Sequence, residues 1–109
     1  MKLLRLCFVF LAVHVHAAYA DKNEQLINQG KNLYNQHCLM CHGTSGAGDG
    51  PVGSNLSKKI QPLKKSAEKQ IVDVLNGGKK DVMPDYRSTL SAEQKQALAK
   101  YMTEVLLNK

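Results

Sequence analysis

The sequence predicts a small, predominantly helical domain, because three segments carry apolar residues at helical spacing and no strands of a βαβ unit are found. The predicted helices cover residues 21–36, 67–76 and 92–107. Capping residues mark their beginnings at Asp21, Ser66 and Ser91. The last helix is expected to turn one apolar face inward, formed by Leu98, Tyr101, Met102 and Val105.

Gly30 lies inside the first predicted helix, where glycine costs up to about 1 kcal/mol relative to alanine. A glycine is favoured at such a position when another backbone must come close. The last predicted helix contains Ala97 and Ala99, which are small enough to allow that approach. We therefore expect the first and last helices to cross near Gly30.

The first twenty residues have the features of a secretory signal peptide. A positively charged start precedes the apolar run Leu6–Val13, and Ala18-Tyr19-Ala20 forms a small-x-small cleavage site. The apolar run is shorter than the roughly 20 residues that a transmembrane helix needs. We therefore expect cleavage after Ala20 and a single domain of residues 21–109 in the periplasm.

The chain is basic, with 15 Lys and Arg against 9 Asp and Glu and a formal net charge of +6. A basic surface can steer the protein toward an acidic face on a partner. Nucleic acid is not expected as a partner, because the chain has few aromatic residues (6%) and carries an export signal. Only two cysteines remain after the predicted cleavage, so a disulfide framework is not available to stabilise this small domain.

Those two cysteines belong to the motif Cys38-Leu39-Met40-Cys41-His42, which has the spacing of a covalent c-type haem attachment site. The thiols of Cys38 and Cys41 lie about one helical turn apart, which suits addition to the two vinyl groups of haem. The imidazole of His42 would follow as the proximal iron ligand. A bound apolar macrocycle would also supply the core that so small a chain lacks.

The cysteine pair has three other interpretations. A thioredoxin-like redox pair belongs at the head of a helix in a βαβ unit, which the sequence does not predict. A structural zinc site needs four ligands, and only His37 and His42 lie near the cysteines. Ordinary structural cysteines are the third possibility. The histidine directly after Cys41, together with the export signal, favours haem attachment.

A glycine-rich loop, Gly43–Gly53, follows the motif and can lie flat against a ligand. It lacks the Gly-Lys-Ser/Thr ending of a phosphate-binding loop. Within it, Pro51 has no N–H but keeps its carbonyl. We expect that carbonyl to accept the Nδ1–H of His42 and to fix the orientation of the imidazole.

The second informative segment is Lys79–Tyr86, which follows the predicted helix stop at Gly77-Gly78. Met83 lies in this loop, directly before Pro84, and not on a helix face where core methionines usually lie. A thioether presented by a stiffened loop suits a metal ligand, so Met83 is predicted to be the distal iron ligand. The basic segment Lys58–Lys65 is predicted to be an exposed loop, and its role is left open.

Together these motifs resemble the class I cytochromes c of the small bacterial monohaem type, over the whole of residues 21–109. The matching segments are Gly30–Tyr34, Cys38–Gly43, Gly46–Pro51, Met83–Tyr86 and Leu98–Tyr101. The resemblance implies an all-α cytochrome c fold with three to five helices packed around one covalently attached haem c. By position it implies covalent attachment at Cys38 and Cys41, iron ligation by His42 and Met83, and an orienting carbonyl at Pro51.

The same resemblance implies an electron carrier and not an enzyme. The expected partners are redox proteins, namely a membrane oxidase, a reductase or a soluble dehydrogenase, with an acidic docking face opposite a rim that includes Lys79 and Lys80. A monomer is expected. Two alternatives stay open: a haem subunit of a larger redox enzyme complex, or an open-site gas-binding haem protein if Met83 does not hold the iron. We expect an apolar cavity between His42 and Met83.

Overall fold

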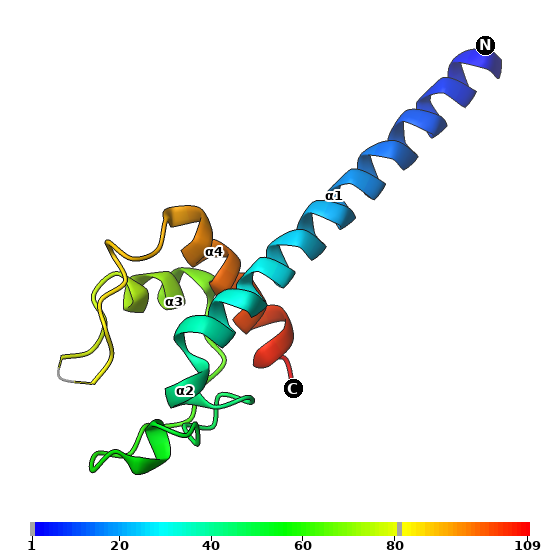
Figure 1. Ribbon diagram of the computed structural model, residues 1–109. Helices are drawn as coiled ribbons and strands as arrows, with labels where there is room; N and C mark the ends of the chain where they lie inside the picture. The colour runs from blue at the N-terminus through cyan, green and yellow to red at the C-terminus, as the bar shows by residue number, and fades with distance from the viewer. Residues whose placement is uncertain (1, 81) are drawn as a thin grey trace.

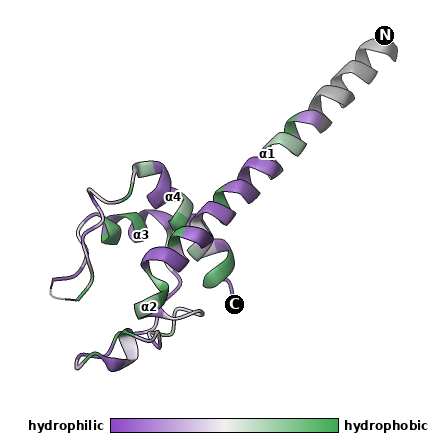
Figure 2. Cartoon of the chain, viewed as in Figure 1, coloured by the Kyte–Doolittle hydropathy of each residue, from purple (hydrophilic) through white to green (hydrophobic). Residues whose placement is uncertain are grey.

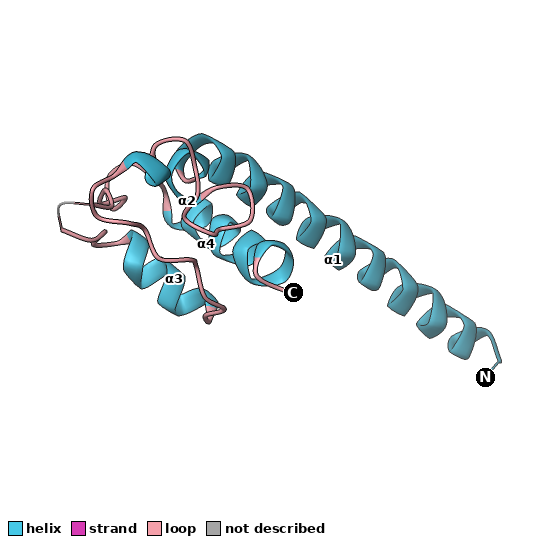
Figure 3. Ribbon diagram, turned by 90° about the horizontal axis from the view of Figure 1, so that it is seen from below, coloured by secondary structure: helices cyan, strands magenta, loops and turns pink. Residues whose placement is uncertain are grey.

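The computed structural model describes the backbone of residues 2–80 and 82–109, and the side chains of residues 14–80 and 82–109. Within these residues the chain forms four α-helices: α1 (Lys2–His37), α2 (Leu39–His42), α3 (Glu68–Leu75) and α4 (Ala92–Tyr101). A 3-10 turn (Gly53–Asn55) precedes α3, and a π-helical segment (Met102–Leu106) continues α4. Figure 3 shows these helices joined by loops, without a sheet in the described residues. The predicted all-α fold is confirmed.

Helix α1 is longer than the sequence analysis predicted, because it begins at Lys2 and not at Asp21. No glycine or proline interrupts the chain before Gly30, so nothing in the local backbone ends a helix there. Figure 1 shows the N-terminal half of α1 projecting away from the other helices. The side chains of the run Leu6–Val13, on which the signal-peptide prediction rests, lie outside the described residues. No helix in the part of the chain that the structure describes is long and apolar enough to cross a membrane.

The crossing of α1 and α4 organises the core. A Cβ built on Gly30 would overlap the carbonyl oxygen of Ala97 and would lie 2.7 Å from the Cβ of Tyr101. Ala97 is fully buried at this contact. The rings of Tyr34 and Tyr101 pack beside it with centroids 5.8 Å apart. The predicted crossing at Gly30 is confirmed, and it requires the absence of a side chain there.

The C-terminal end of α4 departs from the predicted helix. The N–H of Leu107 donates to the carbonyl of Met102 at 2.9 Å, which is the wider hydrogen bond of a π-helical turn. The extra residue in this turn rotates the apolar face, so Leu106 is buried while Val105 is 48% exposed. The prediction that Val105 belongs to the inner face was therefore wrong. Figure 2 shows the hydrophobic C-terminal turn lying beside α1. Hydrophilic and hydrophobic residues interleave along the coloured part of α1.

Helix α3 begins at Glu68, one residue later than predicted. The side chain of Gln70 accepts a hydrogen bond from the N–H of Ala67 at 3.0 Å, while Ser66 donates to the carbonyl of Lys64 and does not cap the helix. Ile71 and Leu75 form the buried face of α3. They join a core cluster with α1, α4 and the segment around Tyr86 and Leu90. This cluster also contains the side chain of Cys38.

The Gly30→Ala variant is expected to unfold more easily than the wild-type protein. Alanine in a helix gains about 1 kcal/mol over glycine, but overpacking a close backbone contact costs typically 1–3 kcal/mol. Because the neighbour here is the backbone of Ala97, which cannot rotate away, the steric cost outweighs the gain. Guanidinium chloride unfolding followed by far-UV circular dichroism measures the difference.

The matched control for this variant is Gly77→Ala, since a Cβ at Gly77 has no neighbour within 4 Å. Its stability is expected to stay within about 0.5 kcal/mol of wild type. A Gly30→Ala protein as stable as this control would show that the helices do not meet as closely as described.

Candidate functional site

A cavity of about 710 Å³ lies between the C-terminal end of α1, the loop after α2, α3 and the segment that carries Met83. Sites for small molecules and cofactors in proteins typically have about 300–1,000 Å³. Both predicted cysteines, His42 and Met83 line this one cavity, although more than forty positions of sequence separate the motif from Met83. The predicted cavity between His42 and Met83 is confirmed.

The motif residues are placed by the junction of α1 and α2. The N–H of Cys38 still donates to the carbonyl of Tyr34 at 2.8 Å, as a continuation of α1. The carbonyl of Cys38 then accepts the N–H of His42 at 2.8 Å, which closes one turn of helix across the motif. Both thiols are free, with Cys38 buried and Cys41 partly buried. The short helix thus holds the two thiols and the imidazole at one wall of the cavity.

The thiol of Cys38 is not activated as a nucleophile. Burial, and then the neighbouring Cys41, raise the pKa of Cys38 to about 11. Redox-active pairs of the thioredoxin type instead carry a thiol of lowered pKa. No group of three or more His, Cys, Asp or Glu side chains able to hold a metal ion occurs among the described residues. These two observations disfavour the thioredoxin-like and structural zinc interpretations of the cysteine pair.

The imidazole of His42 is half-buried, and burial lowers its pKa, so that the ring tends to be neutral. A neutral imidazole offers a ring nitrogen as a metal ligand. Its Nδ1 is buried and makes no hydrogen bond within the protein. Buried polar atoms of this kind are rare and point to a functional demand at the site.

The predicted hydrogen bond from His42 to the carbonyl of Pro51 is absent from this structure. The Pro51 carbonyl instead accepts the side-chain amide of Asn55 at 2.8 Å. The 3-10 turn Gly53–Asn55 explains this, since it folds Asn55 back over Pro51. The loop itself still wraps the motif closely, because the N–H of Val52 donates to the carbonyl of Met40 at 2.8 Å.

Tyr34 supports the motif in a way that the sequence analysis missed. Its hydroxyl is buried and donates to the carbonyl of Gly43 at 2.7 Å, directly after His42. Burial raises the pKa of this hydroxyl far above its usual range, so it stays a hydrogen-bond donor. Gly43 itself has a positive φ of 79°, which ends the turn after His42. Tyr34 lies in the last turn of α1, four residues before Cys38, and that spacing was the available signal.

Met83 also lines the cavity, from a tight hairpin that begins at Lys79. The N–H of Lys79 donates to the carbonyl of Met83 at 3.0 Å, and the N–H of Met83 donates back at 2.9 Å. Gly78 has a φ of 60°, and a Cβ there would lie 2.5 Å from the carbonyl oxygens of Met83 and Pro84. The loop position predicted for Met83 is confirmed, and a glycine at its base is required.

Tyr86 joins the two walls of the cavity. Its N–H donates to the carbonyl of Leu75 at 2.9 Å, which attaches the segment after Met83 to the end of α3. Its hydroxyl donates to the carbonyl of His37 at 3.2 Å, and its ring meets the imidazole of His37 edge-on at 5.8 Å. The segment that follows Met83 is therefore attached to the residue that precedes Cys38.

The basic segment Lys58–Lys65 is a wall of the cavity and not simply an exposed loop. Ile60 and Leu63 are partly buried and line the cavity. The N–H of Leu63 donates to the carbonyl of Gly46 at 2.7 Å, which holds the segment on the glycine-rich loop. Exposed lysines surround these apolar residues; those that also line the cavity are Lys58, Lys59, Lys64, Lys79 and Lys80. We call these five side chains the lysine rim.

The residues around the cavity fit a c-type haem. Two free thiols, an imidazole and a thioether line one mainly apolar cavity of suitable volume. The buried Nδ1 of His42 has no hydrogen-bond partner within the protein, so no protein group engages this side of the ring.

Comparisons with known proteins agree with this assignment. The family described as cytochrome c oxidase, cbb3-type, subunit III matches residues 25–102. The cbb3-type cytochrome c oxidase subunit FixP of Bradyrhizobium diazoefficiens is 31% identical over 75 residues, which are 68% of this chain and 26% of that protein. FixP of Bradyrhizobium sp. (strain ORS 278) is 31% identical over 74 residues, which are 67% of this chain and 25% of that protein. The chain thus spans about a quarter of the length of these curated relatives, and no solved structure matches it.

The family match contains the attachment motif, the segment Lys58–Lys65 and Met83, all of which contribute residues to the lining of the cavity. The chain therefore belongs to the family of cbb3-type cytochrome c oxidase subunit III, and it is a c-type cytochrome electron-transfer domain.

Proposed function

We propose that this domain carries single electrons through one haem c that is attached to Cys38 and Cys41 and ligated by His42 and Met83. The observation that supports this most strongly is the single cavity, which both thiols, the imidazole and the thioether line. When bound, the haem supplies a one-electron redox couple at its iron.

The protein's own residues would then set the properties of that couple. His42 and Met83 would both hold the iron, so no open site would remain for a substrate at the metal. A Met/His ligand pair also raises the reduction potential, because a soft thioether favours reduced iron. The apolar walls, which include Ile71, Leu75 and Leu98, would exclude water from the macrocycle. These features support an electron carrier and not a catalyst.

The lysine rim supports a partner with an acidic docking face. The named relatives are subunits of cbb3-type oxidases, which favours a membrane oxidase among the possible redox partners. We propose that the domain acts as a monomeric shuttle toward such a complex. The alternative is a resident haem subunit of the complex, and size-exclusion chromatography of a gently solubilised native extract separates the two. Elution of the haem protein with the oxidase would favour the resident subunit.

We propose that residues 1–20 are a signal peptide and that residues 21–109 function in the periplasm. The projection of the N-terminal half of α1 away from the other helices agrees with a segment that the domain does not need (Figure 1). N-terminal sequencing of the haem-bearing protein from a periplasmic fraction is expected to begin at Asp21. A haem-bearing protein that keeps residues 1–20 would contradict the cleavage and would indicate a retained N-terminal helix.

Met83→Ala is expected to open one axial position of the iron. The oxidised variant should lose the weak far-red absorption band of Met-ligated haem, and the reduced variant should bind about one equivalent of carbon monoxide. Its reduction potential should fall, because the thioether no longer favours reduced iron. Visible spectra with and without carbon monoxide, and a potentiometric titration, measure these changes.

Met40→Ala is the matched control, since Met40 lies within the attachment motif but is 51% exposed. It should keep the wild-type spectrum and potential. If Met83→Ala also keeps the wild-type spectrum, Met83 is not a ligand, and the open-site gas-binding alternative gains support.

Reversing charge on the lysine rim is expected to slow electron transfer to an acidic partner. Lys79→Glu/Lys80→Glu should reduce the second-order rate constant by about tenfold at low ionic strength and by much less at high salt, where the charges are screened. Stopped-flow mixing with a soluble redox protein of acidic surface measures the rate. Lys22→Glu/Lys69→Glu is the control, since it changes the net charge equally on exposed residues away from the cavity. Equal slowing by both double variants would reject a docking site at the rim.

A further inference from the structure

Lys95 is a buried charged residue that the proposed electron transfer does not use. It is 8% exposed and lies on the inner face of α4, three residues before the fully buried Leu98. Burying an ammonium group is costly unless it is hydrogen-bonded, and an apolar side chain could fill this position without that cost. Its presence in the core therefore calls for a specific partner.

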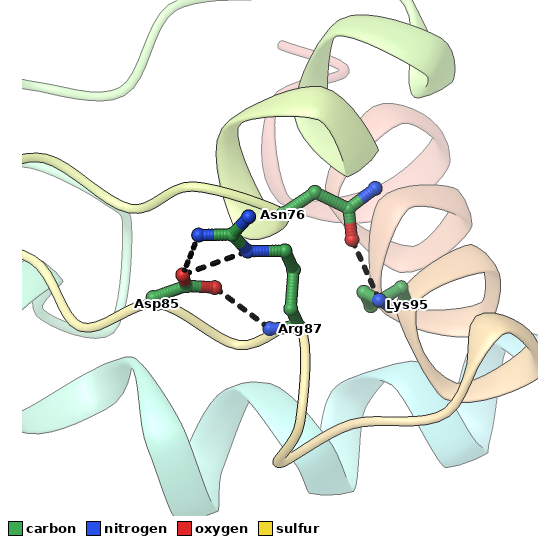
Figure 4. Close-up of polar contacts among 4 residues, drawn as sticks. All are labelled: Asn76, Asp85, Arg87 and Lys95. Atoms are coloured by element: carbon green, nitrogen blue, oxygen red, sulfur yellow. Dashed lines mark hydrogen bonds and ion pairs between the residues drawn. The ribbon is translucent and has the colours of Figure 1, made fainter.

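That partner is Asn76. The ammonium group of Lys95 donates to the side-chain oxygen of Asn76 at 2.6 Å, across the space between α4 and α3 (Figure 4). Asn76 is the C-cap residue of α3, and its own N–H donates to the carbonyl of Val72 at 3.0 Å. A cation at this end of a helix is also favoured by the helix dipole, which has its negative end at the C-terminus. The bond thus ties α4 to the last turn of α3.

The hairpin that carries Met83 begins directly after this last turn of α3. The N–H of Gly78 donates to the carbonyl of Val74 at 2.7 Å, and Gly78 lies against the carbonyls of Met83 and Pro84. On the return side, the N–H of Tyr86 donates to the carbonyl of Leu75, as described above. Both ends of the hairpin therefore rest on the last turn of α3, which Lys95 holds from α4.

The nearby ion pair between Asp85 and Arg87 is local and, unlike the bond between Lys95 and Asn76, does not connect two helices. Its partners are two residues apart, 2.5 Å at their closest, and Arg87 is 67% exposed. Figure 4 shows this pair within one loop, whereas Lys95 and Asn76 reach toward each other from different helices. Arg87 therefore offers a control cation that lies closer in sequence to Met83 but does not join two elements.

We propose that Lys95 is a positioning residue that holds the base of the Met83 hairpin against α4, and so keeps the thioether at the wall of the cavity that His42 also lines. This inference rests on the proposed ligation by Met83, and it adds the residue that maintains that ligation. Lys95 makes no contact with the metal in this account and acts only through Asn76 and the hairpin.

The test compares Lys95→Met with Arg87→Met in the haem-loaded protein. Methionine keeps the length of the lysine stem in the core but removes the donor. During titration with guanidinium chloride, the far-red band reports Met83 on the oxidised iron, and far-UV circular dichroism reports global unfolding. Lys95→Met should lose the far-red band at a clearly lower denaturant concentration than Arg87→Met, while the circular dichroism midpoints of the two variants stay together.

Amide hydrogen exchange gives a readout that does not depend on the metal. The hairpin amides of Lys79, Val82 and Met83 are hydrogen-bonded within the hairpin. They should exchange about tenfold faster in Lys95→Met, as expected from the loss of a hydrogen bond to a charged group, while amides of the α1–α4 crossing are unchanged. Adding Asn76→Ala to Lys95→Met should cause no further change, because both act on one contact.

Two results would overturn the inference. A parallel shift of the far-red band and of global unfolding would make Lys95 a general stabiliser, and unchanged hairpin exchange would show that it does not hold the hairpin. If the wild-type protein lacks the far-red band, Met83 does not ligate the iron. That result would reject both the proposed function and the role of Lys95 in maintaining the ligation. The failure of this inference alone leaves the wild-type band in place.

Discussion

The contact of α1 with α4 at Gly30 determines where both walls of the cavity lie. Because Gly30 has no side chain, the backbone of Ala97 comes close and the two helices cross in contact. The crossing fixes the direction in which α1 ends, and therefore where Cys38 and His42 enter the cavity. It also fixes α4, whose Leu98 and Met102 line the cavity and whose Lys95 supports α3. The absence of a side chain at Gly30 thus positions residues that are far apart in sequence.

The cavity and the core are not separate in this domain. Cys38, Leu98 and Met102 belong to the buried cluster and also line the cavity. So small a chain has little apolar surface to bury, and a macrocycle between these residues would complete the packing. Tyr86 joins the two walls through a backbone hydrogen bond to the carbonyl of Leu75 and a hydroxyl hydrogen bond to the carbonyl of His37, and neither bond needs a ligand. We infer that the chain forms the outline of the site by itself and that the bound group supplies the remaining stability.

The features that could be predicted from the sequence depend on local chemistry. The attachment motif, the close approach at Gly30 and the loop position of Met83 each follow from residue type and spacing. The features that could not be predicted depend on tertiary contacts. The π-helical turn that buries Leu106 in place of Val105, the Asn55 amide on Pro51 and the packing of Ile60 and Leu63 on the glycine-rich loop leave no periodic signal. The sequence carries no signal that singles out Lys95 among the charged residues of its helix, because its contact with Asn76 forms only in the folded structure.

The central claim is that Cys38, Cys41, His42 and Met83 enclose one covalently bound, six-coordinate haem. The most direct test is the visible spectrum of the wild-type protein, matured with its own haem-attachment machinery and recorded oxidised, reduced and reduced under carbon monoxide. The account predicts sharp low-spin bands on reduction, haem that stays with the polypeptide after denaturation, and no change with carbon monoxide. A high-spin spectrum that shifts with carbon monoxide would contradict ligation by Met83, and haem that separates on denaturation would contradict attachment at the two cysteines.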